Sequence, residues 1–303
     1  MPTFELVAVS RFLAGLPHGA YFGIGALVAS DVLGPGKRAQ GVAFVLTGLT
    51  LANVVGVPVG TGLGQQFGWR VAFMIVAAIF ALAAILIAFF VPAHAGDPGR
   101  TLRAELGVFR IPQVWLTLAV GAIGFGGFFA AYSYIASIVT EVAGSPAWAV
   151  PIVLVVMGVG MTVGNLLGGR LADRDLRRTL LGGLALLALV QVLLALTSGW
   201  IVSLVLFVFA VGVVSSVLSP SIQTRLMDVA GDNQSIAAAL NHSALNIGNA
   251  TGAALGGAVI AAGLGFVAPV WVGAALAAAG LVIAVWSFRA DARQKAAPAL
   301  ALS

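Results

Sequence analysis

The chain has 303 residues, of which 60% are hydrophobic and only 8% are charged. A soluble domain has about 45–50% apolar and about 25% charged residues, so this composition excludes a soluble enzyme and a disordered chain. The formal net charge of +5 does not indicate nucleic-acid binding, because the basic residues gather between long apolar runs. The composition therefore predicts an all-α polytopic membrane protein.

Nine apolar segments are each long enough to cross a bilayer as a helix, which needs about 20 residues. In chain order they are 5–30, 40–63, 70–91, 113–140, 148–168, 179–196, 201–224, 235–262 and 266–287. None of them alternates apolar and polar residues as barrel strands do. We expect four regions, namely three helices in 1–91, a central linker over 92–112, six helices in 113–287 and a tail over 288–303.

Positive charge is concentrated in every second segment between these spans. Lys37 and Arg38 follow the first span, and the other basic groups lie at 100–110, 170–178, 225 and 289–295. The positive-inside rule places these segments, and with them the C-terminus, in the cytoplasm. We therefore expect a multi-pass protein of the inner (cytoplasmic) membrane. An odd number of spans puts Met1 outside, although no secretory signal peptide precedes the first span.

Polar residues inside the first span are candidates for function, because polar groups are costly in the hydrocarbon region. Arg11 and His18 share a helical stripe with Gly15, Phe22 and Gly25. Arg11 lies about two turns inside the span. The alternative is that Arg11 extends to the interface and His18 is a packing residue.

Three other spans each carry Asn or His residues on one face. These faces contain Asn53, Gly56 and Gly60 with Pro58 nearby; Gly158, Thr162 and Asn165; and Ser235, His242, Asn246 and Asn249. Such faces line a cavity, or they pack closely and form hydrogen bonds between helices. The residues alone leave both interpretations open.

Signatures of catalysis and of metal binding are absent from the sequence. It contains no HExxH motif, no Walker-type loop and no Cys, and its three His residues have no metal-ligand spacing. We therefore expect no enzyme activity, no metal and no cofactor.

Three motifs resemble the major facilitator superfamily. The segment GRLADRDLRR at 169–178 is similar to the family's G-x-L-A-D-R-x-G-R-R loop, with Leu176 in place of the second Gly. RFLAGLPHGAY at 11–21 resembles the fourth helix of the drug/proton antiporter branch, whose R-x-x-x-G pattern is met by Arg11 and Gly15. GVPVG at 56–60 resembles the fifth-helix antiporter motif, in the form typical of arabinose-efflux-type permeases.

The resemblance implies a major-facilitator-type helical bundle in which the nine spans correspond to helices four to twelve. Folds of this kind have two halves of six helices, so we expect that the first three helices are missing. The implied function is secondary active transport, namely the export of a small organic solute, sugar or drug-like, in exchange for protons. The alternative is a truncated, non-transporting fragment or an assembly partner of the same family.

The resemblance also implies roles for individual residues. Arg11 would couple transport to protons, and the substrate cavity would contain His18, Asn53, Asn165, His242, Asn246 and Asn249. The antiporter-motif bend would lie at Gly56, Pro58 and Gly60, and the cytoplasmic gating loop would contain Gly169, Asp173, Arg174, Arg177 and Arg178. The implied partners are the solute, protons and the lipid bilayer, and the complete protein is expected to be a monomer.

Overall fold

The computed structural model describes residues 4–91 and 106–300, and the regular elements in this part of the chain are helices. The first region contains α1 (Phe4–Leu33), α2 (Arg38–Leu51), the π-helical turn η1 (Ala52–Gly56), α3 (Val57–Phe67) and α4 (Trp69–Phe90). The second begins with the 3-10 turn η2 (Leu106–Arg110), α6 (Pro112–Ala119), η3 (Val120–Gly124), α7 (Gly126–Tyr132), α8 (Ile135–Ser137) and η4 (Ile138–Val142). It continues with α9 (Ala149–Arg174), α10 (Leu176–Thr197), α11 (Ile201–Val229), α12 (Gln234–Ala261) and α13 (Ala268–Leu300).

The expected bundle of membrane-spanning helices is confirmed. Eight helical stretches in the described residues are long and apolar enough to cross a bilayer, and α1 adds a shorter apolar stretch, Tyr21–Leu33. The eight are Arg38–Gly56, Trp69–Phe90, Pro112–Val142, Ala149–Arg174, Leu176–Thr197, Ile201–Val229, Gln234–Ala261 and Ala268–Arg293. Together with α1 they correspond to the nine spans expected from the sequence.

The segment 169–178, expected to be a loop, is helical except at Asp175. Helix α9 continues to Arg174, and α10 begins at Leu176. Asp175 is extended, with φ −156° and ψ 92°, and its side chain accepts a hydrogen bond of 2.9 Å from the backbone N–H of Arg178. This N-cap satisfies a free donor of α10, so the chain reverses within one residue. The loop prediction was wrong because the helix continues beyond the apolar run.

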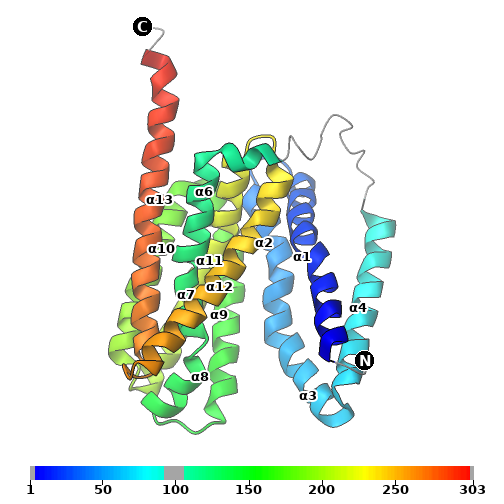
Figure 1. The fold of residues 1–303 in the computed structure, drawn as a ribbon, viewed down its shortest axis with the longest axis vertical. Coiled ribbons are helices and arrows are strands. Elements are labelled where there is room, and N and C mark those ends of the chain that lie inside the picture. Colours follow the sequence, from blue (N-terminus) through cyan, green and yellow to red (C-terminus); the bar gives the residue numbers. More distant parts are fainter. Residues whose placement is uncertain (1–3, 92–105, 301–303) are drawn as a thin grey trace.

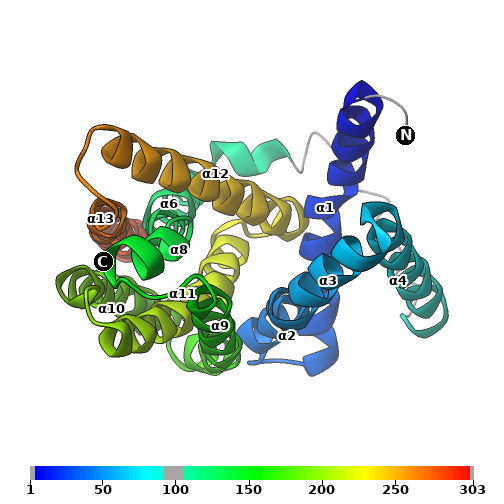
Figure 2. The same ribbon diagram turned by 90° about the horizontal axis from the view of Figure 1, so that it is seen from below.

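The α6–α13 helices form one bundle, and α1–α4 lie beside it (Figures 1 and 2). The two groups meet where α1 packs on α12 and where α2 packs on α9 and α11. Helix α4 packs on α3 and has no buried residue. An exposed helix that is apolar apart from Arg70 near its start suits a lipid environment.

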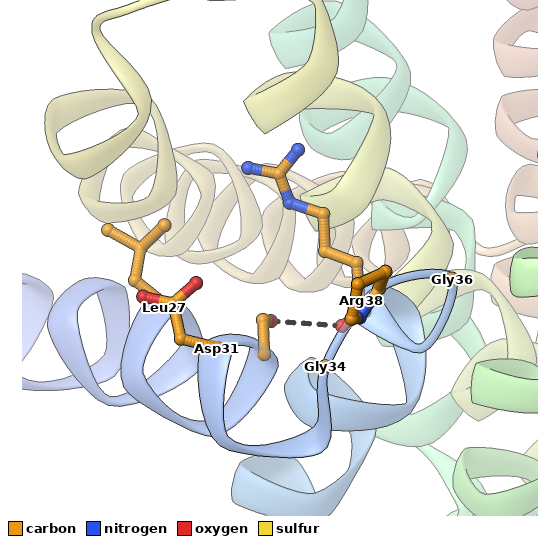
Figure 3. A pocket seen from close by; sticks show the side chains of 7 residues that line it. Leu27, Asp31, Gly34, Gly36 and Arg38 are labelled. Carbon is orange, nitrogen blue, oxygen red and sulfur yellow. Dashed lines mark hydrogen bonds between the residues drawn. The ribbon is translucent and has the colours of Figure 1, made fainter.

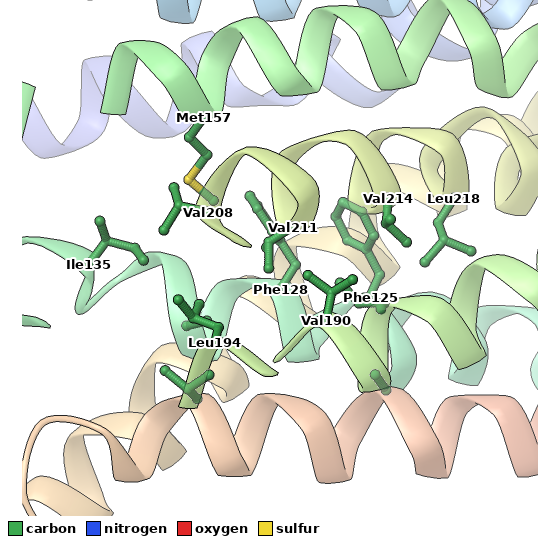
Figure 4. Packing of buried hydrophobic residues seen from close by; sticks show 14 of the residues in the cluster. Phe125, Phe128, Ile135, Met157, Val190, Leu194, Val208, Val211, Val214 and Leu218 are labelled. Atoms are coloured by element: carbon green, nitrogen blue, oxygen red, sulfur yellow. The ribbon is translucent and has the colours of Figure 1, made fainter. Parts of the chain in front are cut away.

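The core lies inside the α6–α13 bundle, between α7, α9, α10, α11 and α13. Figure 4 shows Phe125 and Phe128 packed among Val190, Val211 and Leu218, and all of these are buried. Glycines allow the backbones to approach closely around this core. A Cβ built on Gly168 of α9 would lie 2.7 Å from Cα of Val217 in α11. Such small-residue contacts give van der Waals packing where no water drives helices together.

Candidate functional site

Asp173 joins the end of α9 to the beginning of α2. Its Oδ1 accepts a hydrogen bond of 2.7 Å from the backbone N–H of Ala39. Its Oδ2 accepts from the backbone N–H of Gln40 at 3.1 Å and from Gln40 Nε2 at 2.9 Å. The first N–H groups of a helix have no partner within the helix, and its dipole favours an anion there. Asp173 therefore acts as an N-cap supplied by a distant helix.

Arg38, the first residue of α2, makes a second connection at the same end of the bundle. Its Nη1 lies 3.0 Å from Oδ1 of Asp228 in α11, and its Nη2 donates to Oε1 of Gln234 in α12. Figure 3 shows the side chain extending from α2 toward these helices. We call this end of the bundle, where the basic segments between the spans lie, the basic end. The basic-end clamp is the set of residues Arg38, Ala39, Gln40, Asp173, Asp228 and Gln234.

The contact between α9 and α2 continues from the clamp toward the middle of the bundle. A Cβ on Gly169 would lie 2.9 Å from Cβ of Ala43, so a larger residue there would separate the helices. Asn165 is 1% exposed, and its Nδ2 donates to the Ala43 carbonyl at 2.6 Å and to Thr47 Oγ1 at 3.0 Å. The amide of Asn165 thus lies inside a helix–helix contact.

The polar stripe of α12 is divided between a packed part and an exposed part. His242 is buried against Phe22 of α1, with ring centroids 4.3 Å apart. Asn246 and Asn249 lie further along α12 and are exposed. The structure therefore brings His242 to the α1–α12 contact and leaves the two asparagines outside it.

The remaining predicted basic residues do not join the clamp. Arg174 ends α9 and is exposed. Arg177 lies 5.9 Å from the ring centroid of Phe288, and Arg178 pairs with Asp175 at 3.1 Å. Of the five predicted gating residues, the structure brings only Gly169 and Asp173 against α2.

Several predicted residues have side chains outside the part of the chain that the structure describes. They are Arg11 and His18 in α1, Asn53 in η1 and Pro58 in α3. The backbone is nevertheless informative at Pro58, because the π-helical turn Ala52–Gly56 directly precedes α3. A proline lacks an N–H donor and its ring blocks the carbonyl four residues earlier, so the helix deviates there. Of the three residues predicted for the bend, only Gly56 lies in this turn, and Pro58 and Gly60 lie in α3.

A hollow of about 390 Å³ lies beside the clamp at the α1–α2 turn. Its lining includes Asp31, Gly34 and Arg38 (Figure 3). In it, Ser30 Oγ donates to the Arg38 carbonyl at 3.1 Å. A second hollow lies between α6 and α13. Neither of these two is lined by a residue predicted for the substrate cavity. Among the described residues, no three His, Asp or Glu side chains are grouped as metal ligands would be.

Sequence reasoning missed Arg38, Asp228 and Gln234. Arg38 was counted only as a topology signal. Its position two residues after the Gly-Pro-Gly turn at 34–36 could have indicated a helix N-terminus that needs an anionic partner.

The fold defines a polytopic helical membrane protein. The sequence matches the Major Facilitator Superfamily over residues 1–174 and 149–301. The chain belongs to this family of membrane transporters, which are not enzymes.

Relatives and a solved structure agree with this assignment. The inner membrane transport protein YdhP of Escherichia coli is 36% identical over 292 residues, which are 95% of this chain and 74% of YdhP. The putative transporter AraJ of Escherichia coli is 32% identical, over 87% of this chain and 67% of AraJ. A chloramphenicol resistance protein of Streptomyces lividans is 30% identical, over 93% of this chain and 73% of that protein.

The fold is similar to that of the fucose:proton symporter FucP of Escherichia coli, with a TM-score of 0.67. That alignment covers 90% of this chain and 83% of FucP at 16% identity, so it shows the fold alone.

Proposed function

We propose that this protein exports a small organic solute, sugar or drug-like, across the inner membrane in exchange for protons. The observation that carries the proposal is the basic-end clamp, because its hydrogen bonds connect two helix groups at one end of the bundle. A relative whose name is chloramphenicol resistance protein supports a drug-like solute and outward transport. The R-x-x-x-G pattern at Arg11 and Gly15 supports the coupling to protons.

The clamp would alternate between a formed and a broken state. When it is formed, Asp173 and Asp228 hold the beginning of α2 against α9 and α11. When it is broken, the solute could enter from the basic end, which we assign to the cytoplasm together with the C-terminus. Rocking of two helix groups around a midplane site is how such folds expose a site to either side.

Solute would contact polar residues from several helices. We assign His18, Asn53, Asn246 and Asn249 to the cavity, since Asn246 and Asn249 are exposed on α12. Asn165 and His242 lie in helix–helix contacts and would reach solute only when those contacts open. Arg11 would link protonation to this change.

The second candidate is a fragment or assembly partner that does not transport. It is favoured by α4, which packs only on α3 among the described helices with extensive contacts and has no buried residue among its 22, so much of its surface is open to lipid or to another helix. Such a chain would be stably folded without moving solute.

Reconstitution of the chain in vesicles distinguishes the two candidates. An imposed pH gradient should drive the movement of labelled chloramphenicol or of a labelled pentose, tested as separate probes. Movement of either probe above that in empty vesicles supports export. Monodisperse, folded protein that moves neither probe under any gradient overturns the first candidate in favour of the second.

A further inference from the structure

A groove of about 450 Å³ lies on the outside of the bundle between α6 and α13. Its lining includes Phe109, Arg110, Trp115, Leu116, Trp286 and Ala290. It is at the same end as the basic-end clamp, where α6 begins and α13 continues upward in Figure 1. None of the residues predicted for the substrate cavity lines it.

The lining of the groove is mainly apolar, and hydrogen bonds hold it in place. Trp115 Nε1 donates to the Phe109 carbonyl at 2.8 Å, so the ring of Trp115 is fixed with its polar atom already bonded. Gln113, which also lines the groove, connects α6 to α13, because Ser287 Oγ donates to Gln113 Oε1 at 2.6 Å. Trp115 is 54% exposed and Trp286 is 62% exposed, so two large rings remain uncovered by the described residues.

The polar end of the groove is positively charged. Arg110 lines it and is exposed. Arg293 does not line the groove itself, but it is exposed and lies beyond the lining residue Ala290, seven residues after Trp286 and so two helical turns further along the same face of α13. The nearest carboxylate on α13, Asp291, is paired with Arg225 at 3.1 Å.

We propose that this groove binds an anionic phospholipid of the surrounding leaflet, with its phosphate at Arg110 and Arg293 and an acyl chain along Trp115 and Trp286. Tryptophan rings prefer the level of the headgroups, and basic pockets between transmembrane helices bind anionic headgroups. A soluble phosphate ion would use the arginines but would leave the aromatic floor exposed. A phospholipid satisfies both ends of the groove at once.

Quenching of Trp286 by brominated lipid tests the proposal. The full chain is reconstituted in phosphatidylcholine vesicles that contain a minor fraction of either brominated phosphatidylglycerol or brominated phosphatidylcholine. The difference in tryptophan fluorescence between the unsubstituted chain and its Trp286→Phe variant gives the signal of the Trp286 ring alone. We expect phosphatidylglycerol to quench it at lower lipid fractions. Arg110→Gln should reduce that preference about five-fold, since one arginine near an anionic surface contributes about that factor.

Arg170→Gln is the matched control, because Arg170 is an exposed arginine at the same end of the bundle but on α9. It should leave the preference unchanged, as should added inorganic phosphate. Unchanged helix content and monodispersity show that each variant is folded. The proposal is overturned if both lipids quench Trp286 equally or if Arg170→Gln loses the preference as much as Arg110→Gln does. It is also overturned if neither lipid quenches Trp286, because the groove would then be covered by protein.

Discussion

One carboxylate, Asp173, satisfies donors at the beginning of a helix more than 130 positions away in the sequence. The sequence motif pointed to Asp173 but not to its partners, because a local pattern contains no information on which distant helix will approach. These hydrogen bonds also explain why an aspartate suits position 173. An aspartate at this position accepts from two successive N–H groups and opposes the positive end of the α2 dipole.

Replacing Asp173 by Ala should loosen the contact between the two helix groups. Loss of an N-cap costs about 0.5–2 kcal/mol, so the open population should rise about 2- to 30-fold. The chain has no Cys, so a single Ala238→Cys substitution places one thiol in the buried contact of α12 with α1 and α2. Its rate of labelling by a polar maleimide measures the opening.

Asp232→Ala is the control for that measurement, because Asp232 is an exposed carboxylate in the turn between α11 and α12. It should leave the labelling rate unchanged. An equal rise in both variants would mean that charge alone, rather than the cap, accounts for the effect.

Arg11→Ala should abolish export driven by a pH gradient, because a neutral residue cannot bias a neighbouring titratable group. Arg11→Lys keeps the charge and should retain part of the activity. Arg70→Ala is the control, since Arg70 lies in the first turn of α4 and stacks on Trp69. Transport that persists unchanged in Arg11→Ala would remove the coupling role.

At the scale of the helices, α9 and α11 pack closely along their length, and glycines make this possible. Gly160, Gly164 and Gly168 of α9 meet the backbone of Phe209, Val213 and Val217 in α11. We expect Gly168→Ala to destabilise the protein by about 1–3 kcal/mol, because the added methyl forces the backbones apart. The thermal unfolding midpoint in detergent should fall.

Gly182→Ala provides a matched comparison within α10, where a Cβ would meet nothing within 4 Å. Alanine there should stabilise the helix by about 0.5–1 kcal/mol, because it restricts the unfolded chain. A fall in the midpoint of similar size for both variants would contradict the close-packing explanation.

Hydrophobic length predicted the position of the helices well, but it did not predict their irregularities. The span 201–224 became Ile201–Val229, and the span 148–168 became Ala149–Arg174. Both helices extend past the apolar run, because their backbone hydrogen bonds form equally well outside the membrane. The π-helical turns at Val120–Gly124 and Ile138–Val142 depend on packing against other helices, so periodicity could not predict them.

For the molecule as a whole, the charge pattern predicts which end faces the cytoplasm. We expect the thiol of Asp232→Cys to react with an impermeant maleimide only after cells are permeabilised. The thiol of Gly199→Cys, in the exposed turn between α10 and α11 at the other end, should react in intact cells. The opposite pattern would reverse the proposed orientation.

The candidate site illustrates what a sequence does not contain about the assembled bundle. Asn165 and His242 were recognised as unusual polar residues inside spans, but their burial against α2 and α1 depends on the tertiary arrangement. Asn246 and Asn249 share the helical stripe of His242 and are nevertheless exposed. Helical spacing predicted the shared face and could not predict where along that face the contact ends.

In the transport cycle that we propose, the basic-end clamp also sets an energetic threshold. Arg38 and Asp228 are 30% and 41% exposed, so their pair contributes about 0–1 kcal/mol, and the Asp173 cap adds about 0.5–2 kcal/mol. The closed state is thereby favoured about 2- to 150-fold over the same chain without these bonds. A solute that binds both states equally cannot change that ratio, however tightly it binds. Salt screens the exposed arginine pair, so ionic strength alone should shift the ratio toward opening.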